Sequence, residues 1–134
     1  MNNTLPQKPA GKRDRARSEA YGRNAKRVAV AYLRIKGYRI LARRFRCPAG
    51  EIDIIAKQGR TVIFIEVKAR KNTELALEAV TSNQKKRILN AAQAWLAQKQ
   101  LDQNTQCRFD MIALSAYLMP KHIVNAFGAD PRTW

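Results

Sequence analysis

Three acidic residues interrupt the most apolar part of this chain and restrict what it can become. Glu51 and Asp53 flank Ile52 at the start of the apolar run 52–56, and Glu66 lies within the run 62–67. A strand that is buried on both faces is usually apolar throughout, and an uncompensated charge inside it lowers stability. The two runs therefore predict a β-hairpin whose carboxylates are balanced by another group, and a divalent cation is the first candidate.

Side-chain alternation predicts how the hairpin arranges these acids. Ile52 and Ile54 are expected on one face of the first strand and Asp53 on the other. Matching the apolar faces of the two strands puts Glu66 and Lys68 on the face of Asp53, with Asp53 opposite or diagonal to Glu66. Like charges in such positions destabilise a bare sheet. Because Mg²⁺ is typically held by one or two carboxylates with phosphate oxygens and water, we expect Mg²⁺ or Mn²⁺ as the cofactor.

This constellation predicts phosphodiester hydrolysis. A bound cation polarises a phosphoryl oxygen and lowers the pKa of a water molecule, and Lys68 can orient that water or stabilise the developing charge. The expected catalytic residues are Asp53, Glu66 and Lys68, and the expected metal ligands are Asp53, Glu66 and Glu51. In the alternative interpretation, Glu66 and Lys68 pair only with each other or with Arg108 at the edge of a sheet.

The charge of the chain indicates its partner. Its 26 Lys and Arg against 10 Asp and Glu give a net charge of +16 and a pI near 10.7, and residues 1–46 hold 14 of the basic residues with only 2 acids. Such a protein attracts polyanions, and we expect nucleic acid, above all DNA. A solvated basic surface is the alternative. The side chains expected to contact nucleic acid are Gln84, Lys85, Arg43, Arg44, Arg46 and Arg70.

The chain has no feature of a secreted or membrane protein. Cys47 and Cys107 are far apart and lack metal-ligand spacing, which suits a reducing compartment. The first eighteen residues have no apolar core typical of a secretory signal, and no apolar run approaches the roughly 20 residues that a transmembrane helix needs. We expect a soluble cytoplasmic protein without a membrane partner.

The periodicity of the chain predicts one α/β domain over 19–134, preceded by a disordered basic arm over 1–18. The element order is α-β-β-β-α-β-β, a mixed central sheet flanked by helices. The expected helices cover 19–36 and about 81–100, with a short helical turn at 75–80. The expected strands cover 38–46, 51–56, 61–68, 108–114 and 123–127.

Several linked motifs resemble the YraN family of small bacterial proteins over roughly residues 20–134. The two strongest segments are 50–56 (GEIDIIA) and 62–70 (VIFIEVKAR); further segments are 31–41, 78–85, 108–110 and 125–127. The family is grouped with restriction-endonuclease-like nucleases that carry the PD-(D/E)xK motif and is similar to Holliday-junction resolvases. The resemblance implies a restriction-endonuclease-like fold, an endonuclease acting on DNA, branched DNA included, and a triad of Asp53, Glu66 and Lys68. By analogy with resolvases, it also implies a homodimer.

One position departs from the family pattern. The family usually carries a glutamate in the first helix, which in related resolvases helps to bind metal, and this chain has Lys26 there. Loss of that ligand leaves open a nucleic-acid-binding protein that keeps the nuclease fold without cleavage. A structural protein, in which Asp53 and Glu66 only form salt bridges, is the remaining alternative.

Overall fold

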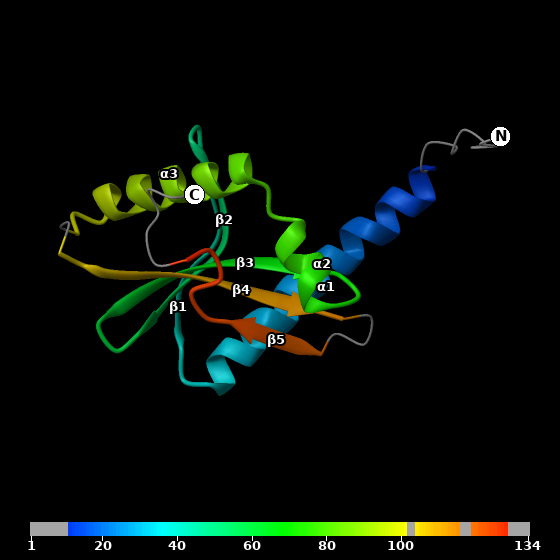
Figure 1. Ribbon diagram of the computed structural model, residues 1–134, viewed down its shortest axis with the longest axis horizontal. Helices are drawn as coiled ribbons and strands as arrows, with labels where there is room; N and C mark the ends of the chain where they lie inside the picture. The colour runs from blue at the N-terminus through cyan, green and yellow to red at the C-terminus, as the bar shows by residue number, and fades with distance from the viewer. Residues whose placement is uncertain (1–10, 102–103, 116–118, 129–134) are drawn as a thin grey trace.

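The computed structural model describes residues 11–101, 104–115 and 119–128 (Figure 1). Its helices are α1 (Lys12–Ile35), α2 (Thr73–Glu78) and α3 (Ser82–Gln98), and its strands are β1 (Arg39–Cys47), β2 (Gly50–Gln58), β3 (Thr61–Ala69), β4 (Gln106–Leu114) and β5 (Pro120–Ile123). The expected α/β order and mixed sheet are confirmed. No helix in these ranges is long and apolar enough to cross a membrane.

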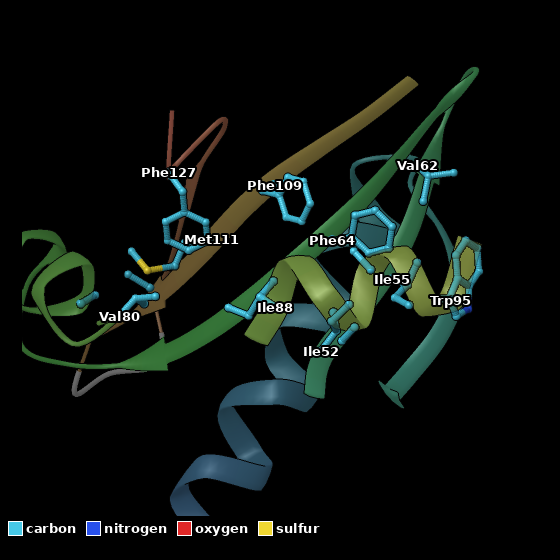
Figure 2. Packing of buried hydrophobic residues seen from close by; sticks show 14 residues of the cluster. Ile52, Ile55, Val62, Phe64, Val80, Ile88, Trp95, Phe109, Met111 and Phe127 are labelled. Atoms are coloured by element: carbon cyan, nitrogen blue, oxygen red, sulfur yellow. The ribbon is translucent and has the colours of Figure 1, made fainter. Parts of the chain in front are cut away.

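The five strands form one sheet in the order β1-β2-β3-β4-β5. Neighbouring strands are antiparallel except β3 and β4, which run parallel because the α2–α3 crossover returns the chain to the same end of the sheet. Helix α1 packs on one face through Ala29 and Leu33, whereas α3 packs on the other through Ile88 and Trp95. Figure 2 shows the α3 side of this core, where Phe64 lies between Phe109 and the helix.

Alternation in β2 is interrupted at Asp53, contrary to expectation. Ile54 packs with α1, but Ile52 packs with α3 as Ile55 does. In the pairing of β1 with β2, Arg43 faces Ile54 and Phe45 faces Ile52. Arg44 and Asp53, which lie between these pairs, are not paired in the ladder. Arg44, opposite Asp53, has a φ of 53°, a left-handed conformation that changes the strand's direction. The expectation that Ile52 and Ile54 share a face is therefore wrong.

The start of α1 and the extent of β5 differ most from the sequence prediction. Helix α1 begins at Lys12 after an extended Gly11, whereas the sequence predicted a helix from residue 19; the Arg, Lys and Ala residues within 12–18 are good helix formers. Residues 1–10 lie outside the described residues. The last strand ends at Ile123, so the prediction of 123–127 is wrong. Proline tolerates the first position of an edge strand, and Asn125, with a φ of 53°, ends the extended segment.

A buried carboxylate fastens β5 to the sheet. Asp110 is fully buried and accepts hydrogen bonds from Arg108, from Nε2 of His122 at 2.7 Å and from the backbone N–H of Asn125 at 3.1 Å. Arg108 also donates to the Tyr38 hydroxyl at 3.2 Å. His122 of β5 is thereby joined to Asp110 of β4.

Candidate active site

The hairpin of β2 and β3 brings Asp53 and Glu66 to the same point of the sheet. Its antiparallel register pairs Ile54 with Ile65. Asp53, which precedes Ile54, therefore lies across from Glu66, which follows Ile65. Only 7% of Asp53 and 8% of Glu66 are exposed. The structure thus brings together the two acids singled out by the sequence, and their chemical roles remain predictions.

Each carboxylate oxygen of Asp53 has its own partner. Oδ2 accepts a hydrogen bond of 2.8 Å from the backbone N–H of Val67 in β3. Oδ1 lies 3.1 Å from Nζ of Lys26 in α1. The first contact fixes the side chain against the neighbouring strand, and the second joins it to the helix that covers this end of the sheet.

Glu66 is held in a different environment. Its Oε1 accepts a hydrogen bond of 3.1 Å from Nε2 of Gln84 and lies 3.3 Å from Nζ of Lys68. Burial, and next the negative charge of Asp53, raise the pKa of Glu66 from 4.5 to about 8, although Lys68 acts in the opposite direction. Without a further positive charge, the two carboxylates therefore resist simultaneous ionisation.

Gln84 lies in the first turn of α3, which positions its side chain next to Glu66. Thr81 caps the helix, and its hydroxyl oxygen accepts the backbone N–H of Gln84 at 3.1 Å. Gly50, the first residue of β2, allows the helix to come close, because a Cβ at Gly50 would collide with the carbonyl oxygen of Arg87. The contact between this strand and helix therefore sets the distance between the acids and the side chains of α3.

These elements enclose a cavity of about 420 Å³, which we call the acidic cavity. It is lined by Glu51, Asp53, Glu66, Asn83, Gln84 and Arg87 among others. The carboxylates offer oxygen ligands to a hard cation, and the guanidinium and amide groups offer donors to an anion such as phosphate. The arrangement can therefore hold a cation and an anionic substrate beside each other.

Two of the three expected metal ligands are close to each other, whereas the third is engaged elsewhere. Glu51 lines the acidic cavity, but Oε1 of Glu51 lies 3.4 Å from Nε of Arg46. In the part of the chain that the structure describes, no three His, Cys, Asp or Glu side chains gather closely enough to hold a metal ion. Asp53 and Glu66 by themselves fit a cation such as Mg²⁺, which commonly takes two carboxylates and completes its shell with water and phosphate oxygens.

A second hollow, of about 530 Å³, lies between α1 and β1, and we call it the α1–β1 cleft. Asp53 lines both hollows. The remaining lining residues of the cleft are Gly22, Arg23, Lys26, Arg27, Arg43 and Arg44. The left-handed φ of Arg44 is unfavourable for a bulky residue by about 1–3 kcal/mol. One acid thus separates a mainly acidic hollow from a strongly basic one.

The residues expected to contact nucleic acid lie in several places. Gln84 lines the acidic cavity, and Arg43 and Arg44 line the α1–β1 cleft. Nζ of Lys85 lies 5.5 Å from the centre of the Phe127 ring, and Lys85 does not line the acidic cavity. Arg46 is engaged with Glu51, and Arg70 lines a separate hollow near β5. The structure therefore does not unite the six residues on one surface.

Sequence reasoning missed two arginines, Arg23 and Arg27, that line the α1–β1 cleft. A signal for both was present, because they are four residues apart and share a helix face with Lys26. The contact of Lys26 with Asp53 was also missed. This contact joins α1 to β2 across 27 positions of the sequence. The spacing of residues within either element does not predict it.

Comparison with known proteins agrees with the motifs of the hairpin. The model of the uncharacterised protein family UPF0102 matches residues 25–114. A UPF0102 protein of Nitrobacter winogradskyi is 49% identical over 108 residues, covering 81% of this chain and 92% of that protein. A UPF0102 protein of a Bradyrhizobium strain is 46% identical over 124 residues, covering 92% of this chain and 90% of the relative. The resemblance to the YraN family is thereby confirmed, and the chain belongs to the uncharacterised protein family UPF0102.

Proposed function

We propose that this protein is a metal-dependent DNA endonuclease that hydrolyses phosphodiester bonds in the acidic cavity. One observation carries the proposal: the buried carboxylates of Asp53 and Glu66 meet at one point of the sheet, with Nζ of Lys68 3.3 Å from Glu66. A chain with a net charge of +16 suits a polyanionic substrate. The resemblance to PD-(D/E)xK nucleases assigns catalysis to the same three residues.

The donor set suits Mg²⁺ or Mn²⁺. Asp53 and Glu66 would hold the cation, and Glu51 on the wall of the same cavity would have to leave Arg46 to join them. Burial and the charge of Asp53 raise the pKa of Glu66 to about 8, so the ammonium groups of Lys26 and Lys68 do not fully offset the cost of ionising both carboxylates. A bound divalent cation would add positive charge beside the pair, and it would supply polarisation of a phosphoryl oxygen and activation of water.

The residues of the chain then have separate tasks. The N–H of Val67 and the amide of Gln84 keep the two carboxylates oriented. The Lys68 ammonium stabilises negative charge that builds on the phosphoryl oxygens, and Arg87 at the cavity wall binds a phosphate oxygen. In the overall reaction, a water oxygen bonds to phosphorus and the bond from phosphorus to one sugar oxygen breaks. One water proton ends on that oxygen as an alcohol.

The proposed substrate is DNA, and the resemblance to resolvases adds branched DNA to the structures worth testing. Labelled four-way-junction, flap and linear DNA are incubated with Mn²⁺ or Mg²⁺ and with the wild type, Asp53→Asn or Lys68→Ala. We expect metal-dependent cutting that falls at least about 100-fold in both variants. Glu74→Gln, which changes an exposed acid of α2, serves as the matched control and keeps full activity. Metal-dependent cutting that survives in Asp53→Asn would sink the proposal.

A second candidate is a nucleic-acid-binding protein without cleavage. The observation in its favour is the ion pair of 3.1 Å between Lys26 and Asp53, because an ammonium there already neutralises one of the two proposed metal ligands. This candidate predicts salt-sensitive DNA binding with no cutting by the wild type or by any of the variants. It also predicts no heat of Mn²⁺ binding in a calorimetric titration.

A further inference from the structure

We infer that the α1–β1 cleft binds the sugar-phosphate backbone of nucleic acid beside the phosphate that is cut. The inference rests on the proposed function for its substrate class, and it adds a second subsite on the opposite side of Asp53 from the acidic cavity. A strand that occupies both hollows passes over Asp53, since this residue lines each of them.

The charge of the cleft suits an anion. Five of its lining side chains are cationic, and Asp53 is the one acid among them. Lys26 pairs with that acid. Across the described residues, no ion pair with an acid involves Arg23, Arg27, Arg43 or Arg44. Four exposed guanidinium groups therefore line one hollow without an acidic partner among the side chains that the structure describes, and phosphate groups can bind them through paired hydrogen bonds.

The backbone of β1 brings two of these groups into the cleft. In a regular strand, consecutive side chains point to opposite faces, so only one of Arg43 and Arg44 would line it. Both do so here, where Arg44 adopts the left-handed φ of 53°. A strained conformation in a residue other than glycine is an observation from which a functional role can be inferred, and the result of this one is a pair of adjacent guanidinium groups.

Gly22 keeps the helix side of the cleft open. It lies in the interior of α1, where glycine is a poor helix former. A Cβ built at this position meets no atom within 4 Å, so close packing does not explain the missing side chain. The space above Gly22 belongs to the cleft and is available to a ligand.

Another basic hollow provides a matched control. Arg39, Lys57 and Arg60 line it at the turn end of the hairpin, and neither Asp53 nor Glu66 does. The lining residues carry a net charge of +4 in the cleft and +3 in this hollow, so charge alone would make the two similar as binding sites. Of these two hollows, the α1–β1 cleft shares Asp53 with the proposed catalytic cavity and the control hollow does not. We therefore expect only the cleft to bind DNA next to the cleaved phosphate.

The test measures binding of the full-length protein to a fluorescein-labelled duplex by anisotropy, in EDTA and at several NaCl concentrations. Two double variants remove cleft charges, Arg23→Gln with Arg27→Gln and Arg43→Gln with Arg44→Gln. Arg39→Gln with Arg60→Gln removes the same charge at the control hollow. We expect each cleft variant to raise Kd at least about 10-fold and to make the plot of log K against log salt less steep by about 2. The control should change Kd less than about 3-fold.

Gly22→Phe tests whether DNA occupies the cleft, because it fills the cleft without changing its charge. Its ring enters the open space of the cleft, so DNA binding should weaken while the melting temperature stays close to that of the wild type. Equal losses in the cleft and control variants, or unchanged binding by Gly22→Phe, would overturn the inference. Because these measurements contain no metal, they are independent of the cleavage assay. Absence of cleavage would contradict the proposed nuclease activity. Equal effects of the cleft and control variants on DNA binding would contradict the proposed role of the cleft.

Discussion

The ammonium of Lys26 lies 3.1 Å from Oδ1 of Asp53, and 30% of the Lys26 side chain is exposed. This positive charge occupies one side of a carboxylate that we propose as a metal ligand. A divalent cation at Asp53 would therefore have to bind against the repulsion of Lys26 or displace the ammonium from the carboxylate. The ion pair gives the buried carboxylate of Asp53 a partner from the first helix.

Lys26→Glu should increase the affinity for Mn²⁺. The substitution removes the competing ammonium and adds a third carboxylate beside Asp53, so we expect a gain of at least about 10-fold in a calorimetric titration, the scale on which groups around a metal site act. Lys86→Glu makes the same charge change at an exposed position of α3 and should alter the affinity much less. Equal gains in the two variants would mean that net charge, and not the position of Lys26, governs binding.

Without metal, stability should fall as the pH rises through the range in which Glu66 titrates. The pKa of Glu66 is raised from 4.5 to about 8 in the folded protein, so between these values the folded state holds a proton that the unfolded state has released. The unfolded state therefore binds fewer protons, and the free energy of unfolding decreases with pH. Urea unfolding between pH 5 and pH 9 measures this slope.

Glu66→Gln should remove that slope, because glutamine resembles the protonated acid and does not titrate. The variant should be close to the wild type in stability near pH 5 and more stable near pH 9. Glu74→Gln, at an exposed site, should keep the wild-type slope. Identical pH profiles for Glu66→Gln and the wild type would contradict the raised pKa of Glu66.

Asp110→Asn should destabilise the fold by about 3–5 kcal/mol, the usual cost of removing one partner from a buried ion pair. Asp110 is fully buried and has Arg108, His122 and the N–H of Asn125 as partners. Burial alone would raise the pKa of Asp110, but the hydrogen bonds from His122, Arg108 and Asn125 lower it below 3.8. Its contribution is therefore present above the unfolded pKa and is lost as the pH falls through the folded one.

Denaturant unfolding at pH 7 measures the effect of Asp110→Asn. The matched control is Glu74→Gln, which neutralises an acid at an exposed site and should change stability by less than about 0.5 kcal/mol. A loss that small in Asp110→Asn would show that the cluster around Asp110 does not fasten β5.

Two glycine-to-alanine substitutions should have effects of opposite sign. Gly22→Ala should stabilise the protein by about 1 kcal/mol, because alanine is the better helix former and its Cβ meets open space. Gly50→Ala should destabilise it by about 1–3 kcal/mol, because the new Cβ collides with the carbonyl oxygen of Arg87. Thermal and urea unfolding give both values. A neutral Gly50→Ala would mean that α3 does not depend on this close contact.

Much of the fold follows from local patterns in the sequence. The β-branched residues of β3 and the apolar spacing of α3 predict those elements, since each period reports the geometry of its own segment. The hairpin places Asp53 opposite Glu66 because a short loop and two apolar faces leave little freedom of register. The start of α1 and the position of β5 were predicted less well, because charge-rich helices and edge strands carry weak periodic signals.

The sequence by itself therefore determined the order of the elements and the pairing of the two acids across the hairpin. Only the tertiary structure decided that Lys26 meets Asp53, that Gln84 meets Glu66 and that Arg44 turns into the α1–β1 cleft. These contacts join separate elements, and they depend on how each helix packs on its face of the sheet. Packing of that kind is a property of the assembled core, whereas periodicity reports only one element at a time.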